Sequence, residues 1–435
     1  MNIGIVGGGI AGLTAAYRLG QAGHAVTVYE AGPEVGGQAR TFPIAGTRLE
    51  VFYHHLFAGD REILNLIAEL GLTGQMDWLE SRQGFFHGGT IYDFGTPVSL
   101  LKFKPLNPLA RLRAGLMLLF LMKYRNWRAL EPVTAVDWVR RWGGQGAYNV
   151  IFGPLLRGKF GSSAHEVSMT WLWGKVHLRG ASRSEGLQKE RLGYMRGSFQ
   201  VLLDALVAAI EAQGGTIHTS TPVERILVEN GRAVGIDYAT RTLRAFHDAI
   251  IATVPSAAFL RLTPDLPEDY AANLRWMRYQ RALCLVLQLT RPLSHIYWLN
   301  ISAPDIPFVG VIEQTNYIPP QVYNGKHIVY VTNYVAPDSD LYRLSKEELF
   351  ACYLPHLQRI NPAFAPDWVE ESWLFRDEAG QPIVTCDYRA HIPDYVTPIR
   401  GLYLANTTQI YPQDRGMNYS VRLGNVIADV VKRET

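Results

Sequence analysis

The sequence predicts an α/β protein with two domains, one of which binds a nucleotide, while the other is mixed α+β. A glycine-rich turn of the form G-x-G-x-x-G lies between a strand and a helix pattern at residues 7–12. Strand and helix patterns of the same kind return near the middle and at the end of the chain. We therefore expect a Rossmann-like domain from the three segments 1–75, 195–255 and 396–435, and a substrate-binding domain from 76–194 and 256–395.

The opening unit predicts a dinucleotide site, because each glycine has a physical task there. A short apolar run typical of a buried strand precedes the turn. Gly7 permits the tight turn, Gly9 lets the backbone approach a pyrophosphate, and Gly12 brings the helix close to the strand. We expect the pyrophosphate to lie against the free N–H groups of the helix start, which begins at Ile10 and Ala11.

An acid ends the second strand pattern. Glu30 lies 18 residues after Gly12 and is followed by Ala31. This is close to the spacing of the acid that binds ribose hydroxyls in dinucleotide sites. Strand, glycines, helix, strand and acid therefore occur in the expected order.

A second glycine pair follows six residues after Glu30 and precedes Thr41. It resembles the second fingerprint of FAD enzymes related to flavin amine oxidases, protoporphyrinogen oxidases and phytoene desaturases. Plain nicotinamide dehydrogenases do not usually carry it, so the resemblance implies FAD. The residues that it assigns to the cofactor are Gly36, Gly37, Gln38, Ala39 and Arg40.

The same resemblance assigns later positions. Val223 matches a valine whose backbone binds the adenine, and Thr253 follows the strand that returns the chain to the other domain. Flavoproteins of this class end with a strand, a turn and a helix whose start points at the flavin pyrimidine edge. Asn406 stands where Gly-Asp is usual, and whether Asp414 replaces that acid stays open. The remaining residues that we assign to this motif are Gly416, Met417 and Asn418.

Two departures from the amine oxidases bear on the chemistry. These enzymes place a lysine near flavin N5, whereas the matching strand here reads Ala-Leu-Cys-Leu at residues 282–285. Residues 380–383, Gly-Gln-Pro-Ile, stand where the cysteine of a covalent flavin and a tyrosine of an aromatic cage would be. The resemblance therefore implies non-covalent FAD and disfavours simple amine oxidation.

A pair of histidines provides the candidate catalytic residues. In the resembling families an acid followed by glycines passes close to the flavin ring at this point. Glu50 fits the acid, while Phe52 and Tyr53 stand where glycines would be. Together with His54 they are candidates for contact with the cofactor. His54 and His55 titrate near neutrality and could move a proton, or they could be hydrogen-bonded in a structural loop.

We expect an FAD-dependent oxidoreductase that takes a hydride from a bulky apolar small molecule, porphyrinogen-like or isoprenoid-like. An alternative rests on residues 55–57, which resemble the His-x-Phe of UDP-galactopyranose mutases, and on the many arginines of 140–196. It is a non-redox flavoenzyme acting on a sugar nucleotide. A third hypothesis is a flavin-binding protein without catalysis.

Residues 76–194 are predicted to be largely helical and contain a basic, apolar stretch. Seven Lys or Arg residues and no acid occur between residues 102 and 128, around the apolar run 114–122. This run is either a core helix or channel wall, or a helix that docks on an anionic membrane surface. Both interpretations remain open.

Composition sets further limits. The chain is 48% apolar and 19% charged, as expected of globular domains. A net charge of +3 is too small to indicate nucleic acid. The three cysteines are far apart in sequence, which indicates no metal site and a reducing compartment. With no apolar run of bilayer length and a fold that starts at residue 2, we expect a cytoplasmic protein, with membrane contact at the inner face as the second interpretation. The oligomeric state is not indicated.

Overall fold

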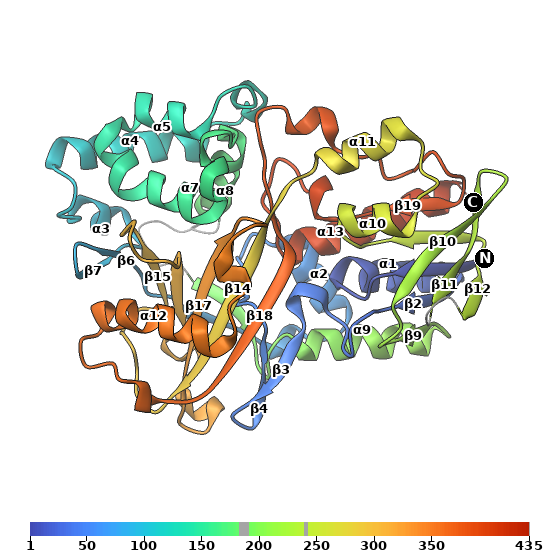
Figure 1. The fold of residues 1–435 in the computed structure, drawn as a ribbon, viewed down its shortest axis with the longest axis horizontal. Coiled ribbons are helices and arrows are strands. Elements are labelled where there is room, and N and C mark those ends of the chain that lie inside the picture. Colours follow the sequence, from blue (N-terminus) through green and yellow to red (C-terminus); the bar gives the residue numbers. More distant parts are fainter. Residues whose placement is uncertain (182–190, 239–241, 435) are drawn as a thin grey trace.

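The structure is a computed structural model that describes residues 1–181, 191–238 and 242–434. Two sheets organise it, a parallel one at the right of Figure 1 and a larger mixed one at the centre and left, with a block of helices above the latter. This arrangement confirms the expected α/β fold with a second, mixed unit. The domain boundaries given above stay a prediction.

The parallel sheet is assembled from strands far apart in sequence. Its order is β19-β13-β1-β2-β9, and all its pairs are parallel. The strands are β1 (Asn2–Val6), β2 (Ala25–Tyr29), β9 (Thr216–His218), β13 (Ala249–Ala252) and β19 (Leu402–Leu404). Successive side chains of a strand point to opposite faces, so Ile3 and Ile5 enter one apolar cluster and Val6 another.

Both faces of this sheet are covered, as parallel sheets require. The helices α1 (Ile10–Gln21), α9 (Gln200–Ala212) and α13 (Met417–Glu434) cover one face. The antiparallel strands β10 (Val223–Glu229), β11 (Arg232–Tyr238) and β12 (Leu243–Phe246) cover the other. Gly424 lets α13 approach α1, because a Cβ there would lie 2.6 Å from the carbonyl oxygen of Ala11.

The larger sheet has the order β18-β14-β17-β16-β15-β6-β7, with β15 and β6 as its parallel pair. Its strands are β6 (Gln83–His87), β7 (Thr90–Asp93), β14 (Tyr279–Leu289), β15 (Trp298–Ile301), β16 (Gly310–Glu313), β17 (His327–Val335) and β18 (Val369–Pro382). Helix α12 (Lys346–Ile360) packs on one face. Because β6 and β7 complete its edge, segment 76–194 is not solely helical.

The helical block lies at the end of the larger sheet, away from β1 and β2 (Figure 1). Its helices are α3 (Pro97–Leu101), α4 (Pro108–Lys123), α5 (Ala135–Trp142), α6 (Gly144–Ala147), α7 (Gly153–Phe160) and α8 (Met169–Ala181). Asn107 caps α4 by accepting a hydrogen bond from Ala110 N at 2.8 Å, and Pro108 occupies the first turn.

Shorter elements connect these units. They are α2 (Arg61–Glu69), α10 (Ser256–Leu262), α11 (Glu268–Trp276), β3 (Thr41–Ile44), β4 (Thr47–Glu50), β5 (Met76–Glu80) and β8 (Arg191–Met195). Strands β5 and β8 pair with each other, at the two ends of segment 76–194. Within the described ranges, every helix is too short or too polar to cross a bilayer.

Candidate functional site

The glycine turn joins the carboxyl end of β1 to α1. Gly7 has a φ of 111°, a left-handed conformation that glycine adopts without strain. A Cβ at Gly12 would lie 2.1 Å from the carbonyl oxygen of Gly7, so only glycine lets the helix lie this close. Gly9 is the N-cap of α1 and has no side chain to bind the N–H groups of the first turn, which begins with Ile10 and Ala11. This arrangement suits a phosphate.

Glu30 holds its carboxylate beside the glycine turn. Its Oε2 accepts a hydrogen bond from Gly8 N at 2.7 Å, and its Oε1 accepts one from Gly32 N at 2.7 Å. Ala31 is exposed next to it. A carboxylate can accept about four hydrogen bonds, so Glu30 keeps capacity for two ribose hydroxyls.

The second glycine pair, Gly36 and Gly37, folds against the first turn. Gly36 N donates to the carbonyl oxygen of Gly8 at 2.8 Å, and Gly36 forms a parallel bridge with Gly9. A Cβ on Gly37 would lie 3.2 Å from the Cα of Gly9, so a side chain there would press on the turn. Arg40 Nη1 donates to the carbonyl oxygen of Gly37 at 2.9 Å, which brings its charge to this contact.

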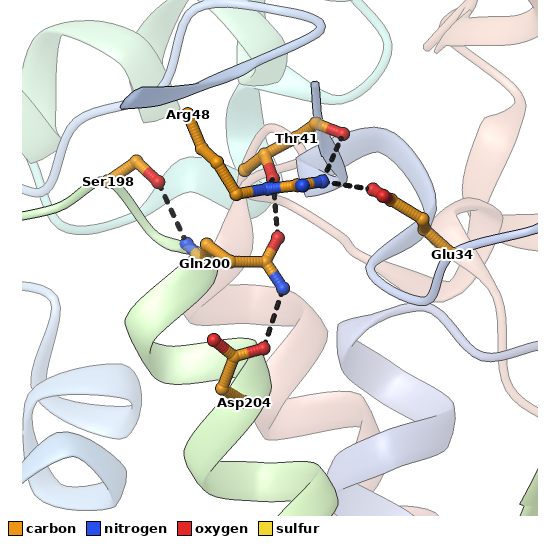
Figure 2. A network of polar contacts seen from close by, with 6 residues as sticks. All are labelled: Glu34, Thr41, Arg48, Ser198, Gln200 and Asp204. Carbon is orange, nitrogen blue, oxygen red and sulfur yellow. Dashed lines mark hydrogen bonds and ion pairs between the residues drawn. The ribbon is translucent and has the colours of Figure 1, made fainter. Parts of the chain in front are cut away.

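A network of polar contacts anchors the loop that carries the second glycine pair (Figure 2). Arg48 forms an ion pair with Glu34 at the start of the loop, and its Nε donates to Thr41 Oγ1 at 2.8 Å at the end. Thr41 also binds Gln200 on α9, whose Nε2 donates to Asp204 Oδ1 at 2.7 Å. Arg48 of strand β4 therefore holds the loop at both ends, and helix α9 holds it at Thr41.

Two further predicted residues lie around the turn. Thr253 follows β13, and its Oγ1 donates to the carbonyl oxygen of Gly7 at 3.0 Å. Val223 begins β10 and packs in the apolar cluster between that strand and the parallel sheet. Just before it, Ser220 N donates to the carbonyl oxygen of Gly32 at 2.7 Å. The segment therefore runs beside the loop that follows β2.

The carboxyl-terminal residues divide between different places. Asn406 is buried after β19, and its Nδ2 donates to the carbonyl oxygen of Val254 at 3.1 Å, near the end of β13. Met417 begins α13 and is buried. Asn418 Oδ1 accepts a hydrogen bond from Ile63 N at 3.2 Å, so this side chain holds α13 to α2.

A group of charges around the buried Asp414 joins the residues before α13 to the helical block. Asp414 Oδ2 forms ion pairs with Lys159 Nζ of α7, at 3.1 Å, and with Lys175 Nζ of α8. Its Oδ1 accepts a hydrogen bond from Gln381 Nε2 at 2.9 Å. Arg415 follows in the chain, and we call these five residues the Asp414 cluster. Lys159 and Asp414 are 255 positions apart in sequence.

The electrostatics of the cluster favour an ionised Asp414. Burial alone would raise the pKa of the Asp414 carboxyl, but Lys159 and its basic neighbours hold that pKa well below its usual range. Burial lowers the pKa of Lys159, and Asp414 opposes this effect. Lys159 Nζ also lies 5.1 Å from the ring centre of Tyr334 and 5.6 Å from that of Trp171, within cation–π range.

Arg415 connects the cluster to the second glycine loop. Its Nη1 donates to Gln38 Oε1 at 3.0 Å, and its Nη2 donates to Tyr334 OH at 2.8 Å. Gln38 Nε2 in turn donates to the carbonyl oxygen of Ala379 at 3.1 Å. Arg415 Nε is buried and has no hydrogen-bond partner among the described residues. A buried unpaired donor is costly, and a ligand atom at this place would satisfy it.

His54 lies near Arg415 and is partly buried. Its Nδ1 is 2.6 Å from the carbonyl oxygen of Phe52. Because a carbonyl only accepts, Nδ1 carries the proton and Nε2 is an acceptor. Burial and the charge of Arg415 lower the pKa of His54 to about 4, although the bond to Phe52 opposes them. His54 is therefore neutral at neutral pH.

Aromatic rings surround His55. Its Nδ1 lies 3.2 Å from Tyr297 OH, and its ring meets that of Trp298 edge-on with the centroids 5.5 Å apart. Tyr53 packs edge-on against the same indole at 5.0 Å. Burial holds the pKa of Tyr297 well above its usual range, so this phenol stays neutral. The four side chains form what we call the aromatic wall.

Glu50 has a structural place in the core. Its carboxylate accepts hydrogen bonds from Tyr194 OH at 2.7 Å and Phe199 N at 2.8 Å, and its carbonyl oxygen accepts one from Tyr330 OH at 2.8 Å. Burial raises the pKa of Glu50 to about 7, against the effect of these hydrogen bonds. The residue joins three segments that are distant in sequence.

The structure brings most of the predicted residues into two neighbouring groups, one at the glycine turn and one at Arg415. Ala39 is instead buried in the core below the loop, and Asn418 binds α2. Gly416 precedes α13, and a Cβ there would make an ordinary contact with the Tyr419 ring, 4.0 Å from its Cδ2. Sequence reasoning missed Lys159, Lys175, Gln381 and Arg415. The one available signal was the position of Arg415 between Asp414 and Gly416.

Both groups fit the dinucleotide that the motifs imply. An uncapped helix start lies at the glycine turn, and an unpaired buried donor lies at Arg415. Gln38 joins the two groups. Among the described residues, no set of His, Cys, Asp and Glu side chains could hold a metal ion.

Comparison with known proteins also indicates a flavin-binding protein. The sequence model of the flavin-containing amine oxidoreductases matches residues 10–413. Carotenoid phi-ring synthase of Streptomyces griseus is 27% identical over 323 residues, which cover 67% of this chain and 60% of that protein. The chain spans about three fifths of the length of the curated relatives that it matches.

Solved structures share the fold over the whole chain. A protein provisionally named protoporphyrinogen oxidase from Exiguobacterium sp. 255-15 has a TM-score of 0.78 at 17% identity, covering 100% of this chain and 99% of that one. Reduced UDP-galactopyranose mutase has a TM-score of 0.77 at 17% identity, covering 100% and 96%. At this identity the likeness concerns the fold alone.

Proposed function

The chain belongs to the family of flavin-containing amine oxidoreductases and uses FAD as its cofactor; from this we propose that it removes a hydride from a bulky, apolar small molecule. The observation that carries the substrate class is the aromatic wall, which includes the neutral phenol of Tyr297 and flanks His54 in the chain through Tyr53 and His55. The relative from Streptomyces griseus is named for a carotenoid, an extended apolar molecule of this kind.

The residues divide the task of holding the cofactor. The backbone of the glycine turn and the guanidinium of Arg40 would hold the pyrophosphate, Glu30 the ribose, and the backbone of Val223 the adenine. At the other end, Arg415 Nε would donate to the ring system, with Gln38 positioning the guanidinium. When bound, FAD supplies the acceptor for the hydride, while the protein supplies orientation and electrostatics.

His54 is the candidate to accept the proton. Its Nε2 carries a lone pair because Nδ1 donates to the carbonyl oxygen of Phe52. A pKa of about 4 keeps this nitrogen unprotonated at neutral pH, so its lone pair is free to accept, although a group with so low a pKa is a weak base. His55, which Tyr297 orients, is the second candidate.

Anaerobic mixing of the FAD-loaded protein with apolar donors tests this function. Isoprenoid and porphyrinogen donors should bleach the visible flavin band and yield an oxidised product. His54→Ala should retain FAD and slow bleaching by about 100-fold or more, while Phe246→Ala, on the distant strand β12, should not change it. Failure of every apolar donor, with rapid bleaching by a charged one, would overturn the proposal.

The sugar-nucleotide alternative has less support from the side chains. It rests on the resemblance of residues 55–57 and on the arginines of 140–196, and several of the arginines that the structure describes have other partners. Arg140 lies over Tyr148 with 4.3 Å to the ring centre, Arg141 lies over Trp142 at 5.6 Å, and Arg196 forms an ion pair with an aspartate. Binding of a nucleotide diphosphate sugar by the dithionite-reduced protein alone would reverse this preference.

A further inference from the structure

Helix α4 carries apolar side chains on two opposite faces. Ala114, Met117 and Leu121 are buried and pack in the helical block. The opposite side carries large apolar residues at spacings of three and four, which place them on one face of a helix. These residues and their exposed fractions are Leu109 (75%), Leu112 (54%), Leu116 (59%), Leu119 (54%) and Phe120 (53%).

Neighbouring helices extend this exposed surface. Val98 and Leu101 of α3 are 46% and 56% exposed, and Trp142 at the end of α5 is 54% exposed. Arg113 of α4 holds Trp142 close, because its Nε donates to the carbonyl oxygen of Trp142 at 2.8 Å. We call the eight apolar residues of α3, α4 and α5 the α4 face. Monomeric proteins seldom expose so many large apolar side chains together.

Exposed basic residues flank the apolar residues of α3 and α4 along the chain. The stretch from residue 94 to residue 130 contains seven Lys or Arg residues and no Asp or Glu. Six of them are exposed, namely Lys102, Lys104, Arg113, Lys123, Arg125 and Arg128. The nearest acids along the chain are Asp93 and Glu131, which stand outside the stretch.

We propose that the α4 face docks the protein on the surface of a membrane containing anionic lipids. Apolar side chains in the middle of a basic surface match the boundary between acyl chains and anionic headgroups. A second copy of this chain is the less suitable occupant, because a symmetric contact would bring together two copies of the basic stretch 94–130, which contains no acid. With no membrane-spanning helix in the described residues, contact through this face is peripheral.

The position of α4 relates the docking surface to the candidate site. Helix α8 packs against α4 and contains Lys175, which forms an ion pair with Asp414. In Figure 1, α4 lies at the outer side of the helical block, and α8 lies at its inner side toward the rest of the molecule. One layer of helices therefore separates the membrane surface from the Asp414 cluster. The docking proposal does not depend on the proposed reaction.

Co-sedimentation of the FAD-loaded protein with vesicles tests the proposal. The protein should pellet with equal mixtures of phosphatidylglycerol and phosphatidylcholine, and much less with phosphatidylcholine alone. Leu116→Asp combined with Leu119→Asp should weaken pelleting by at least tenfold, since about two apolar anchors are lost. Lys123→Gln combined with Arg125→Gln should weaken it by about tenfold.

The matched control is Leu243→Asp combined with Phe246→Asp, because these residues of β12 are 51% and 62% exposed at a distant surface. This variant should pellet like the parent protein. Flavin absorbance and thermal melting verify that all variants fold. Two outcomes overturn the proposal: no pelleting with the anionic vesicles, or a lipid-free dimer that the α4 variants dissociate while vesicle binding is unchanged.

Discussion

The glycine turn and the Asp414 cluster form the two ends of the candidate cofactor site by opposite means. The turn consists of backbone from one stretch of six residues, and its chemistry depends on the absence of side chains. The cluster consists of four charged side chains and the amide of Gln381, from four segments of the chain, and its chemistry depends on their mutual positions. We therefore expect the turn to be sensitive to an added atom, and the stability of the cluster to be sensitive to a removed charge.

The same contrast separates the buried acids. Asp414 has ammonium groups beside it, which keep its pKa low despite burial. Glu50 has a phenol and a backbone N–H as partners, and burial raises its pKa to about 7. The pKa of a buried carboxyl is therefore lowered where a cation lies close by and raised where none does.

The largest effect is expected from Asp414→Asn. The change leaves Lys159 and Lys175 without their buried anion, which should lower the free energy of unfolding by about 3 kcal/mol. Because the glycine turn is untouched, the folded protein should still take up FAD. Urea denaturation measures the first effect and flavin absorbance the second. Asp429→Asn, which removes an exposed partner of Lys432, is the matched control and should cost less than about 1 kcal/mol.

Gly12→Ala should have the second-largest effect, and it should affect the other end of the candidate site, the glycine turn. A Cβ 2.1 Å from the carbonyl oxygen of Gly7 forces α1 away from β1, at a cost of about 2 kcal/mol. Here FAD uptake should be lost, unlike in Asp414→Asn. Gly74→Ala is the control, since a Cβ there meets nothing within 4 Å. Normal FAD binding by Gly12→Ala would contradict the backbone role of the turn.

The pH dependence of the stability of Glu50→Gln tests the contrast between Glu50 and Asp414. The folded pKa of Glu50, about 7, is raised above its unfolded value. The protonated Glu50 carboxyl therefore stabilises the folded state at low pH, and this contribution to the free energy of unfolding is lost as pH rises through 7. Between pH 5 and pH 8 this loss amounts to about 2 kcal/mol. Glutamine does not ionise, so denaturation midpoints of the variant should fall less over this range. An unchanged pH profile would show that Glu50 has an ordinary pKa.

The prediction with the smallest expected effect concerns the titration of His54, which lies near Arg415. Because its pKa is lowered to about 4, it should not titrate between pH 5.5 and pH 8. Proton NMR of protein labelled at histidine Cε1 measures this, with the resonance assigned by its absence in His54→Asn. Titration of this resonance near pH 6.5 would mean that Arg415 and burial do not act on His54 as the structure indicates.

Local patterns predicted the turn well. G-x-G-x-x-G, the second glycine pair and Glu30 each follow a strand at a short spacing, and the structure places them in contact through Gly8, Gly9 and Gly36. The α/β fold, the family and FAD followed from these motifs. The exact cofactor contacts and the domain boundaries remain predictions.

The charged cluster was not predictable in the same way. Lys159 lies in the last turn of α7, a helix that begins with glycine and proline, and Lys175 lies in the apolar helix α8; no local pattern distinguishes either from a surface lysine. Their pairing with the buried Asp414 identifies them, and this pairing is decided by how α7 and α8 pack against the residues before α13. The two open interpretations of α4 likewise depended on which of its faces the other helices cover.

The sequence by itself determined the features that depend on local backbone geometry. The effect of a glycine in a turn is confined to residues within a few positions of it. The sequence thereby specified the nucleotide-binding turn, the cofactor and the class of fold. Tertiary structure decided which charges meet Asp414, which acid is left without a cation, and which face of α4 stays exposed. These outcomes depend on Coulomb interactions and burial between segments far apart in the chain, and no local spacing encodes them.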